Sequence, residues 1–155
     1  MTVTDDRMAE VGAPRRRKED ARLITGRTNW TDNIVLPGML HMAILRSPMA
    51  RARITQIDAS AARSQPGVVD VFTGRDIADI QGSLPCAWPV TEDIIMPNRP
   101  PLAVDQVNHT GEPVAVVVAR SKAAAVDAIA AIDVDYEPLP VVLDMEAAIA
   151  DGAEL

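Results

Sequence analysis

The residue types that most often carry out chemistry are few in this chain and lie far apart in the sequence. The two histidines, His41 and His109, fall in different parts of the chain. Because a histidine metal site needs ligands that converge on one point, we expect both to be structural. Asp133 and Asp135 are two residues apart on one predicted strand, so their side chains lie on the same face and could together bind a cation. A sheet face exposed to solvent is the favoured interpretation.

Cys86 is the only cysteine. A single thiol excludes an internal disulfide, an iron–sulfur cluster bound by this chain alone and a zinc site built on thiolates. A nucleophilic cysteine needs a neighbouring base or a helix N-terminus, and the sequence indicates neither. We therefore interpret Cys86 as a buried or incidental thiol. An independent cysteine enzyme would require an unusually acidic thiol, which thiol titration near neutral pH tests.

Composition excludes several classes of partner. The net charge is -7 and aromatic residues make up only 3%, which disfavours nucleic-acid binding through a basic groove with stacking rings. The longest apolar run, Val114–Ala119, is far below the ~20 residues that a membrane helix needs. The first twelve residues have no apolar signal-peptide core, so a cytoplasmic location is expected.

The chemistry-bearing residues need a scaffold, and the apolar patterning predicts one made of strands and short helices. Candidate strands are short apolar, alternating or β-branched runs, namely Met39–Leu45, Arg53–Asp58, Val68–Phe72, Pro113–Ala119, Ile132–Tyr136 and a short Val141–Leu143. Candidate helices are Ala59–Ser64, Ala123–Ile132 with Ser121 as N-cap, and a last helix capped by Asp144. The long helix is expected to bury Val126, Ile129 and Ala130.

The predicted fold class is therefore α+β, with a mixed sheet, a β-α-β unit in the second half and a long proline-rich loop. If the strands that flank the long helix are parallel, their crossover should be right-handed. We expect a flexible leader over residues 1–14, one domain over 15–150 and a C-terminal tail over 151–155.

Residues Gln81–Pro101 form the proline-rich loop. They contain five prolines and no sustained periodicity, and long loops inside compact domains are usually functional or disordered. The loop also carries more apolar side chains than a solvated linker, including Leu84, Trp88 and Met96. This composition indicates burial against another surface.

Several stretches together resemble the α/β hammerhead module of the xanthine dehydrogenase, aldehyde oxidase and carbon monoxide dehydrogenase large (molybdenum-binding) subunit family. They include Arg-Leu-Ile-Thr-Gly-Arg at 22–27, LRSPMARARITQID at 45–58, Phe-Thr-Gly-Arg-Asp-Ile at 72–77, GEPVAVVVA at 111–119 and VDYEPLP at 134–140. Their order covers most of residues 15–150. Where relatives typically have histidines around Arg-Ser-Pro, this chain has Met49 and Arg51.

The resemblance implies an oxidoreductase that hydroxylates an aldehyde or an N-heterocycle with water. Its molybdopterin-molybdenum, iron–sulfur clusters and FAD are expected on other domains or subunits, with the pterin-binding large chain and the iron–sulfur and flavin subunits as partners. The family's base and pterin-binding motifs would lie beyond Leu155. No catalytic, cofactor-binding or metal-binding residue is therefore transferred to this chain, and the isolated chain is expected to be inactive.

One local contribution is a hypothesis about the proline-rich loop, because in relatives the corresponding stretch helps to wall the substrate funnel. The candidate funnel residues are Trp88, Ile94, Ile95 and Met96. A loop that only packs on the partner domain fits the same composition equally well. Two functions are weighed on this basis: a non-catalytic module or small subunit of a molybdenum hydroxylase, and a free-standing small-ligand or protein-interaction module without redox activity.

Overall fold

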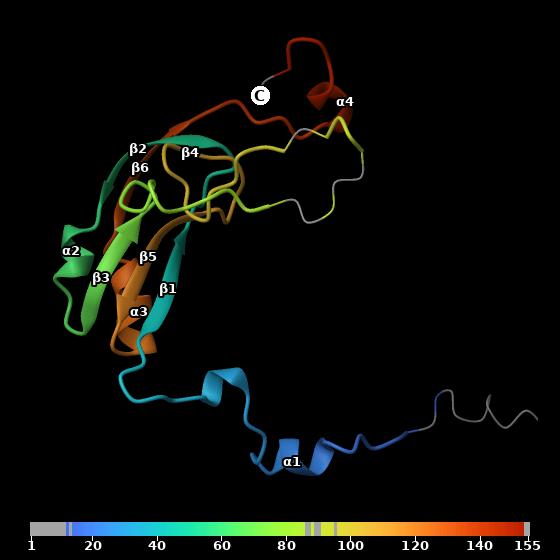
Figure 1. The fold of residues 1–155 in the computed structure, drawn as a ribbon, viewed down its shortest axis with the longest axis vertical. Helices are drawn as coiled ribbons and strands as arrows, with labels where there is room; N and C mark the ends of the chain where they lie inside the picture. Colours follow the sequence, from blue (N-terminus) through green and yellow to red (C-terminus); the bar gives the residue numbers. More distant parts are fainter. Residues whose placement is uncertain (1–11, 13, 86–87, 89–90, 95, 154–155) are drawn as a thin grey trace, which may run out of the picture. The chain divides into compact units, whose positions relative to one another are not determined.

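A computed structural model describes residues 12, 14–85, 88, 91–94 and 96–153 (Figure 1). The chain divides into two compact units, Met1–Pro37 and Gly38–Leu155. The first unit contains the short helix α1 (Asp20–Ile24) and the 3-10 turn η2 (Thr31–Asn33). Just before α1 the Arg17 backbone N–H donates a hydrogen bond to the Asp20 carboxylate at 3.0 Å, which ties the preceding turn to the start of the helix.

The second unit is built on a three-stranded antiparallel sheet, which we call sheet A. Its order is β1 (His41–Arg46), β5 (Pro113–Ala119) and β3 (Val68–Thr73). The central strand β5 has the bounds predicted from its apolar run, because a strand with neighbours on both edges and a helix on one face is mostly buried. Val117 lies at its centre and is fully buried.

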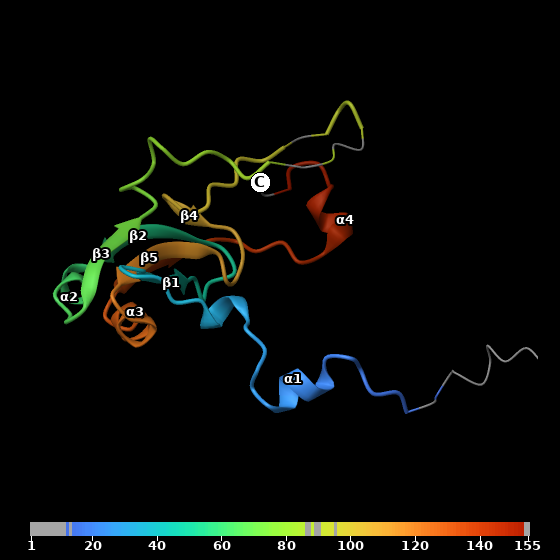
Figure 2. The ribbon, with the colours of Figure 1, turned by 60° about the horizontal axis from the view of Figure 1, so that its bottom comes forward.

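Helix α3 (Lys122–Ile129) covers one face of sheet A (Figure 2). The predicted N-cap is confirmed, since the Ser121 hydroxyl accepts a hydrogen bond from the Ala124 backbone N–H at 3.1 Å. The predicted helix face is wrong in part: Ala125 and Ala128 are the buried residues, whereas Val126 is 54% exposed. Alanines at the contact allow the helix to approach the strands closely, which a valine on that face would prevent.

A second antiparallel sheet, sheet B, has the order β4 (Gln106–Val107), β2 (Ala52–Asp58) and β6 (Asp133–Pro138). A core separate from that under α3 packs against its inner face. This core consists of Ala52, Ile54, Ala103, Val107 and Val114, with Tyr136 and Met49 at its margin. Val114 belongs to β5, so the two sheets share a boundary through that strand.

The α+β class is confirmed, but the expected single mixed sheet is replaced by two antiparallel sheets among the described residues. The strand–helix–strand order is present as β5–α3–β6, yet its two strands belong to different sheets. Both edges of β5 are already paired, with β1 and β3, so β6 cannot join that strand and pairs with β2 instead. The condition for a right-handed crossover is therefore not met.

Two short helices complete the second unit, α2 (Ser60–Arg63) and α4 (Met145–Ala148). The predicted cap of α4 is confirmed, because the Asp144 carboxylate accepts a hydrogen bond from the Ala147 backbone N–H at 2.8 Å. The strand predicted at Val141–Leu143 is wrong. The chain leaves sheet B after Leu139, whose N–H donates to Arg51 O, and 141–143 pair with no strand. No helix among the described residues is long and apolar enough to cross a membrane.

Candidate functional site

The base of the proline-rich loop is closed by hydrogen bonds between its two ends. The Leu84 backbone N–H donates to Arg99 O at 2.8 Å, and the Arg99 N–H donates to the Ser83 hydroxyl at 2.9 Å. Closer to the strands, the Gln81 side chain bonds both to Gly74 O and to the Leu102 N–H, each at 3.1 Å. The loop therefore starts and ends at a defined place on the second unit.

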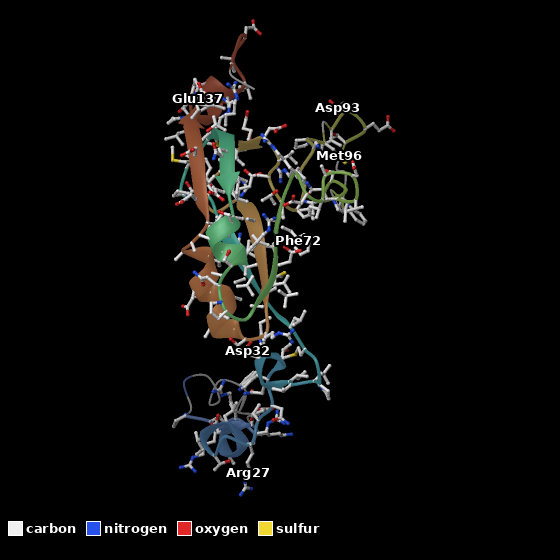
Figure 3. All side chains as sticks on the ribbon, turned by 90° about the vertical axis from the view of Figure 1, so that its left-hand side faces the viewer. Arg27, Asp32, Phe72, Asp93, Met96 and Glu137 are labelled. Carbon is white, nitrogen blue, oxygen red and sulfur yellow. The ribbon has the colours of Figure 1, made fainter. Side chains whose placement is uncertain are left out.

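Three described apolar side chains beyond this base are exposed on the chain itself. Trp88 is 81% exposed, Met96 61% and Ile94 39%, so these three predicted funnel residues contribute little to either core. The fourth, Ile95, lies outside the described residues. In Figure 3, Asp93 and Met96 lie on the loop, away from the sheet residues Phe72 and Glu137. The loop thus presents apolar surface outward from a closed base.

A hollow of about 770 Å³ lies between the two limbs of the loop. Its lining is mainly apolar and includes one cationic side chain, that of Arg99. The lining residues are Ser83, Leu84, Pro85, Ile94, Met96, Pro97, Asn98 and Arg99. The size is in the range of sites that take small organic molecules. Two predicted funnel residues, Ile94 and Met96, line this hollow together.

A second apolar surface lies on the face of sheet A that α3 does not cover, and we call it the open face. Strand register places five side chains on it: Met42, Ile44, Phe72, Val116 and Val118. Met42 is 64% exposed and Phe72 38% exposed, while the other three are half-buried. Contiguous exposed apolar side chains of this kind typically mark a contact surface.

The turn after β1 is held by a buried serine that the sequence analysis did not single out. Ser47 is 2% exposed. Its backbone N–H donates to Glu112 O at 2.9 Å, and its carbonyl accepts from the Gly111 N–H at 2.8 Å. The Ser47 hydroxyl accepts the Met49 N–H at 3.0 Å. Ser47 therefore aligns the turn after β1 with the turn before β5.

Polar groups around this turn have structural partners. The Glu112 carboxylate, largely buried, accepts a hydrogen bond from the Asn108 N–H and lies 3.5 Å from His109 Nδ1. Burial raises the pKa of the Tyr136 hydroxyl, and a hydrogen bond with Ser47 opposes that shift. This set shapes the turns and has no feature of a nucleophile with its base.

The other candidates from sequence are dispersed. His41 begins β1, away from the turn that holds His109. The outward side chains of Asp133 and Asp135 are exposed, opposite Asp58 and Gln56 of β2. Within the described part of the chain, no cluster of three or more histidine, cysteine or acidic residues is placed to hold a metal ion. Cys86 lies outside the described residues.

Gln81 and Gly74 organise the loop base, and sequence analysis assigned neither a role. Gly74 stood within the Phe-Thr-Gly-Arg-Asp-Ile motif, but only coordinates show that a Cβ there would lie 2.1 Å from Ala103 O. Gln81 is an ordinary polar residue at a loop boundary, and its partner Leu102 is distant in sequence. The motif was the one available signal for Gly74.

The fold defines a class of small α+β module, with two antiparallel sheets and a long loop whose base is closed by hydrogen bonds. Residues 25–140 match the family described as aldehyde oxidase and xanthine dehydrogenase, a/b hammerhead domain. The chain belongs to this family, which confirms the resemblance found in the sequence.

The relatives are oxidoreductases of the molybdenum hydroxylase type. The nicotine 6-hydroxylase large subunit of Paenarthrobacter nicotinovorans is 43% identical over 88% of this chain and 16% of the relative. The 6-hydroxypseudooxynicotine dehydrogenase complex subunit gamma of the same organism is 39% identical over 97% of the chain and 19% of the relative. The chain thus spans less than a fifth of the length of these relatives.

Solved structures agree with the sequence relatives. The quinoline 2-oxidoreductase of Pseudomonas putida 86 superposes with a TM-score of 0.78 and 45% identity, over 90% of this chain and 17% of that chain. A Cu,Mo-CO dehydrogenase superposes with a TM-score of 0.75 and 38% identity, over 93% of this chain and 17% of that chain. The hammerhead fold is therefore shared with molybdenum hydroxylases.

Proposed function

We propose that the chain is a non-catalytic hammerhead module or small subunit of a molybdenum hydroxylase, which supplies scaffold and part of the wall of the substrate approach. The observation that carries the proposal is the loop 81–101, which has a closed base and an exposed apolar tip. A rigid base with apolar side chains projecting from it suits a wall that sorts substrates by size and shape.

The proposed substrate class is an N-heterocycle that is hydroxylated with water. Two relatives, at 43% and 45% identity, are named for nicotine and quinoline, which are both N-heteroaromatic compounds. The aldehyde oxidoreductases from Desulfovibrio gigas and Desulfovibrio desulfuricans are 28% and 26% identical. This difference favours an N-heterocycle over an aldehyde.

The proposed partner is a pterin-binding large chain or region that carries molybdopterin-molybdenum, with iron–sulfur clusters and FAD on further domains or subunits. Relatives named as a molybdenum-binding subunit and as a complex subunit gamma support this assignment. The described residues offer no ligand set that fits a metal centre. We therefore assign them no step of the reaction.

The proposed scaffold role draws on the open face of sheet A. Two of its apolar side chains, Met42 and Phe72, are exposed on the second unit, and the other three are half-buried. Burying them against the large chain would remove apolar surface from water, at roughly 25 cal/mol per Å². The free-standing binding module is not favoured, because the relatives are long oxidoreductase chains.

The test of the funnel role uses single alanine variants of Trp88, Ile94, Ile95 and Met96 in the assembled enzyme. We measure kcat/KM for a small and a bulky N-heterocycle and compare their ratio with that of the unaltered enzyme. A wall residue shifts this ratio, because removing its side chain widens the approach more for the bulky substrate.

Val126→Ala is the matched control, since Val126 is an exposed apolar residue on α3 and lies outside the loop. We expect it to leave the ratio unchanged. If all four loop variants also leave the ratio unchanged, the funnel role is wrong and the loop serves only as packing surface.

A further inference from the structure

Gln81 stands where the chain leaves the turns after β3 and enters the loop. Its Nε2 donates a hydrogen bond to Gly74 O, and its Oε1 accepts one from the Leu102 N–H, both at 3.1 Å. Gly74 precedes the loop and Leu102 follows it. One partly buried side chain therefore bridges the chain on either side of the loop.

The two partners of Gln81 belong to the rigid part of the second unit. Leu102 and Ala103 are buried, and the Ala103 N–H donates to Pro113 O at the start of β5 at 2.9 Å. Gly74 is packed so tightly on the same segment that a Cβ would lie 2.1 Å from Ala103 O. The carboxamide is thus held by backbone that has little room to move.

The hydrogen bonds of Ser83 and Leu84 with Arg99 play a different part. They join one limb of the loop to the other, whereas Gln81 joins the loop to the strands. The Gln81 backbone N–H also donates to Ile77 O at 2.9 Å, which ties the start of the loop to the turns after β3. The Gln81 side chain in addition reaches Leu102, in the segment that follows the loop.

The chemistry of the two partners requires an amide at this position. A carbonyl must receive a donor and an N–H must receive an acceptor, and the glutamine carboxamide carries both on one rigid plane. A glutamate carboxylate would still accept from Leu102 N–H but would face Gly74 O with no proton. A methionine of similar length would satisfy neither partner.

We propose that Gln81 is a positioning residue that fixes the direction of the loop by bridging Gly74 and Leu102. Its effect on substrate choice rests on the proposed function, whereas its effect on loop order does not. Gln81 touches neither substrate nor cofactor in this inference. It acts through the placement of Ile94, Met96 and the rest of the loop tip.

The test compares Gln81→Glu and Gln81→Met in the assembled enzyme by amide hydrogen exchange. We expect the Leu102 amide to exchange about fivefold faster or more in Gln81→Met, since the net contribution of one hydrogen bond corresponds to roughly that factor. Gln81→Glu should give a smaller increase, because it retains the acceptor for Leu102. Val117 in β5 should keep its wild-type rate in both, which shows that the sheets are intact.

Gln106→Met is the matched control. Gln106 is also partly buried and donates its Nε2 to Asn108 Oδ1 at 2.7 Å, but it is not bonded to the loop. It should leave Leu102 exchange unchanged. If Gln81→Met disturbs Val117 as well, Gln81→Ala, which also lacks the acceptor, replaces it in the comparison. A wild-type Leu102 rate with Val117 unchanged, in whichever of these two variants keeps the sheets intact, overturns the proposal.

Steady-state kinetics on the same variants separates this proposal from the function on which it draws. If both are right, Leu102 exchange rises and the kcat/KM ratio between bulky and small substrates shifts, with kcat for the small substrate unchanged. If exchange rises and the ratio stays constant, Gln81 positions the loop and the funnel role is wrong. If exchange does not change, the positioning role itself is wrong.

Discussion

Replacing Gly74 by alanine should destabilise the chain, even though Gly→Ala normally does the opposite. Gly74 does not need a positive φ, so its backbone conformation is open to any residue. On entropy alone the substitution would stabilise the protein by about 0.4–1 kcal/mol. The added Cβ, however, would lie 2.1 Å from Ala103 O and 2.7 Å from Ala103 C.

Both atoms that the Cβ would meet belong to buried backbone, so the clash cannot be relieved by rotating a side chain. Overpacking of this kind costs about 1–3 kcal/mol. Subtracting the entropy gain from the upper part of that range gives a net decrease of about 2 kcal/mol in the free energy of unfolding. For a chain of this length, that corresponds to a fall in Tm of roughly 4–8 °C.

Gly82→Ala is the matched control, because no atom lies within 4 Å of its ideal Cβ and its φ is not positive. We expect its stability to equal or slightly exceed that of the unaltered chain. Unfolding should be followed by circular dichroism, since Trp30 and Trp88 are both exposed and report poorly on the sheets. If Gly74→Ala and Gly82→Ala have the same Tm, the close approach of Gly74 to Ala103 is wrong.

Three further predictions concern the framework. Ser121→Ala removes the hydroxyl that accepts the Ala124 N–H and should lower the free energy of unfolding by about 1 kcal/mol in urea titration; an unchanged value would exclude the cap. Val117→Ala opens a cavity at a fully buried site and should cost about 2 kcal/mol, whereas Val126→Ala, at an exposed site, should change stability by less than about 0.5 kcal/mol. Hydrogen bonds from Thr73 lower the pKa of Asp76, so the Asp76 carboxylate stabilises the fold at pH values above its ordinary pKa. This stabilisation is lost as the pH falls through the lowered pKa. Asp76→Asn should therefore make the stability of the chain fall less steeply with pH on the acid side, and an unchanged slope would contradict the assignment.

The local part of the fold was predictable from sequence because its signals are local. The apolar run of β5 gave its bounds, and Ser121 and Asp144 act as caps through the backbone amides three residues ahead. Strand pairing was not predictable in the same way. β5 pairs with β1, which lies far away in the sequence, and the residue pattern of neither strand indicates which strand it pairs with.

The face of α3 shows why large apolar residues are an unreliable guide to burial. Sequence favoured Val126 for the core, yet the contact with sheet A is made through Ala125 and Ala128. The size of the side chains at the contact limits how closely a helix can approach a sheet, and alanines allow a close approach. A one-residue rotation then decides which apolar residue faces the solvent, and composition alone does not fix it.

The composition of the sequence indicated which segment forms the loop, but not which residues attach the loop to the rest of the second unit. Prolines and apolar side chains identified the loop. Ile94 and Met96 line one hollow, and their funnel role stays a prediction. Its attachment depends on Gly74 and Gln81, whose contacts across the loop give no local pattern in the sequence.

The base and the tip of the loop 81–101 use different residues, so the tip can be substituted without disturbing the base. The base uses backbone groups, one glycine and one carboxamide, and these contacts do not depend on which side chains stand between Pro85 and Asn98. Trp88, Ile94 and Met96 are exposed and contribute little to either core, so replacing them costs little folding free energy. If the proposed funnel role is right, substitutions at these residues alter substrate preference while sheets A and B keep their stability. The open face of sheet A has less freedom, because Ile44, Val116 and Val118 are half-buried there and replacing them would remove packing contacts.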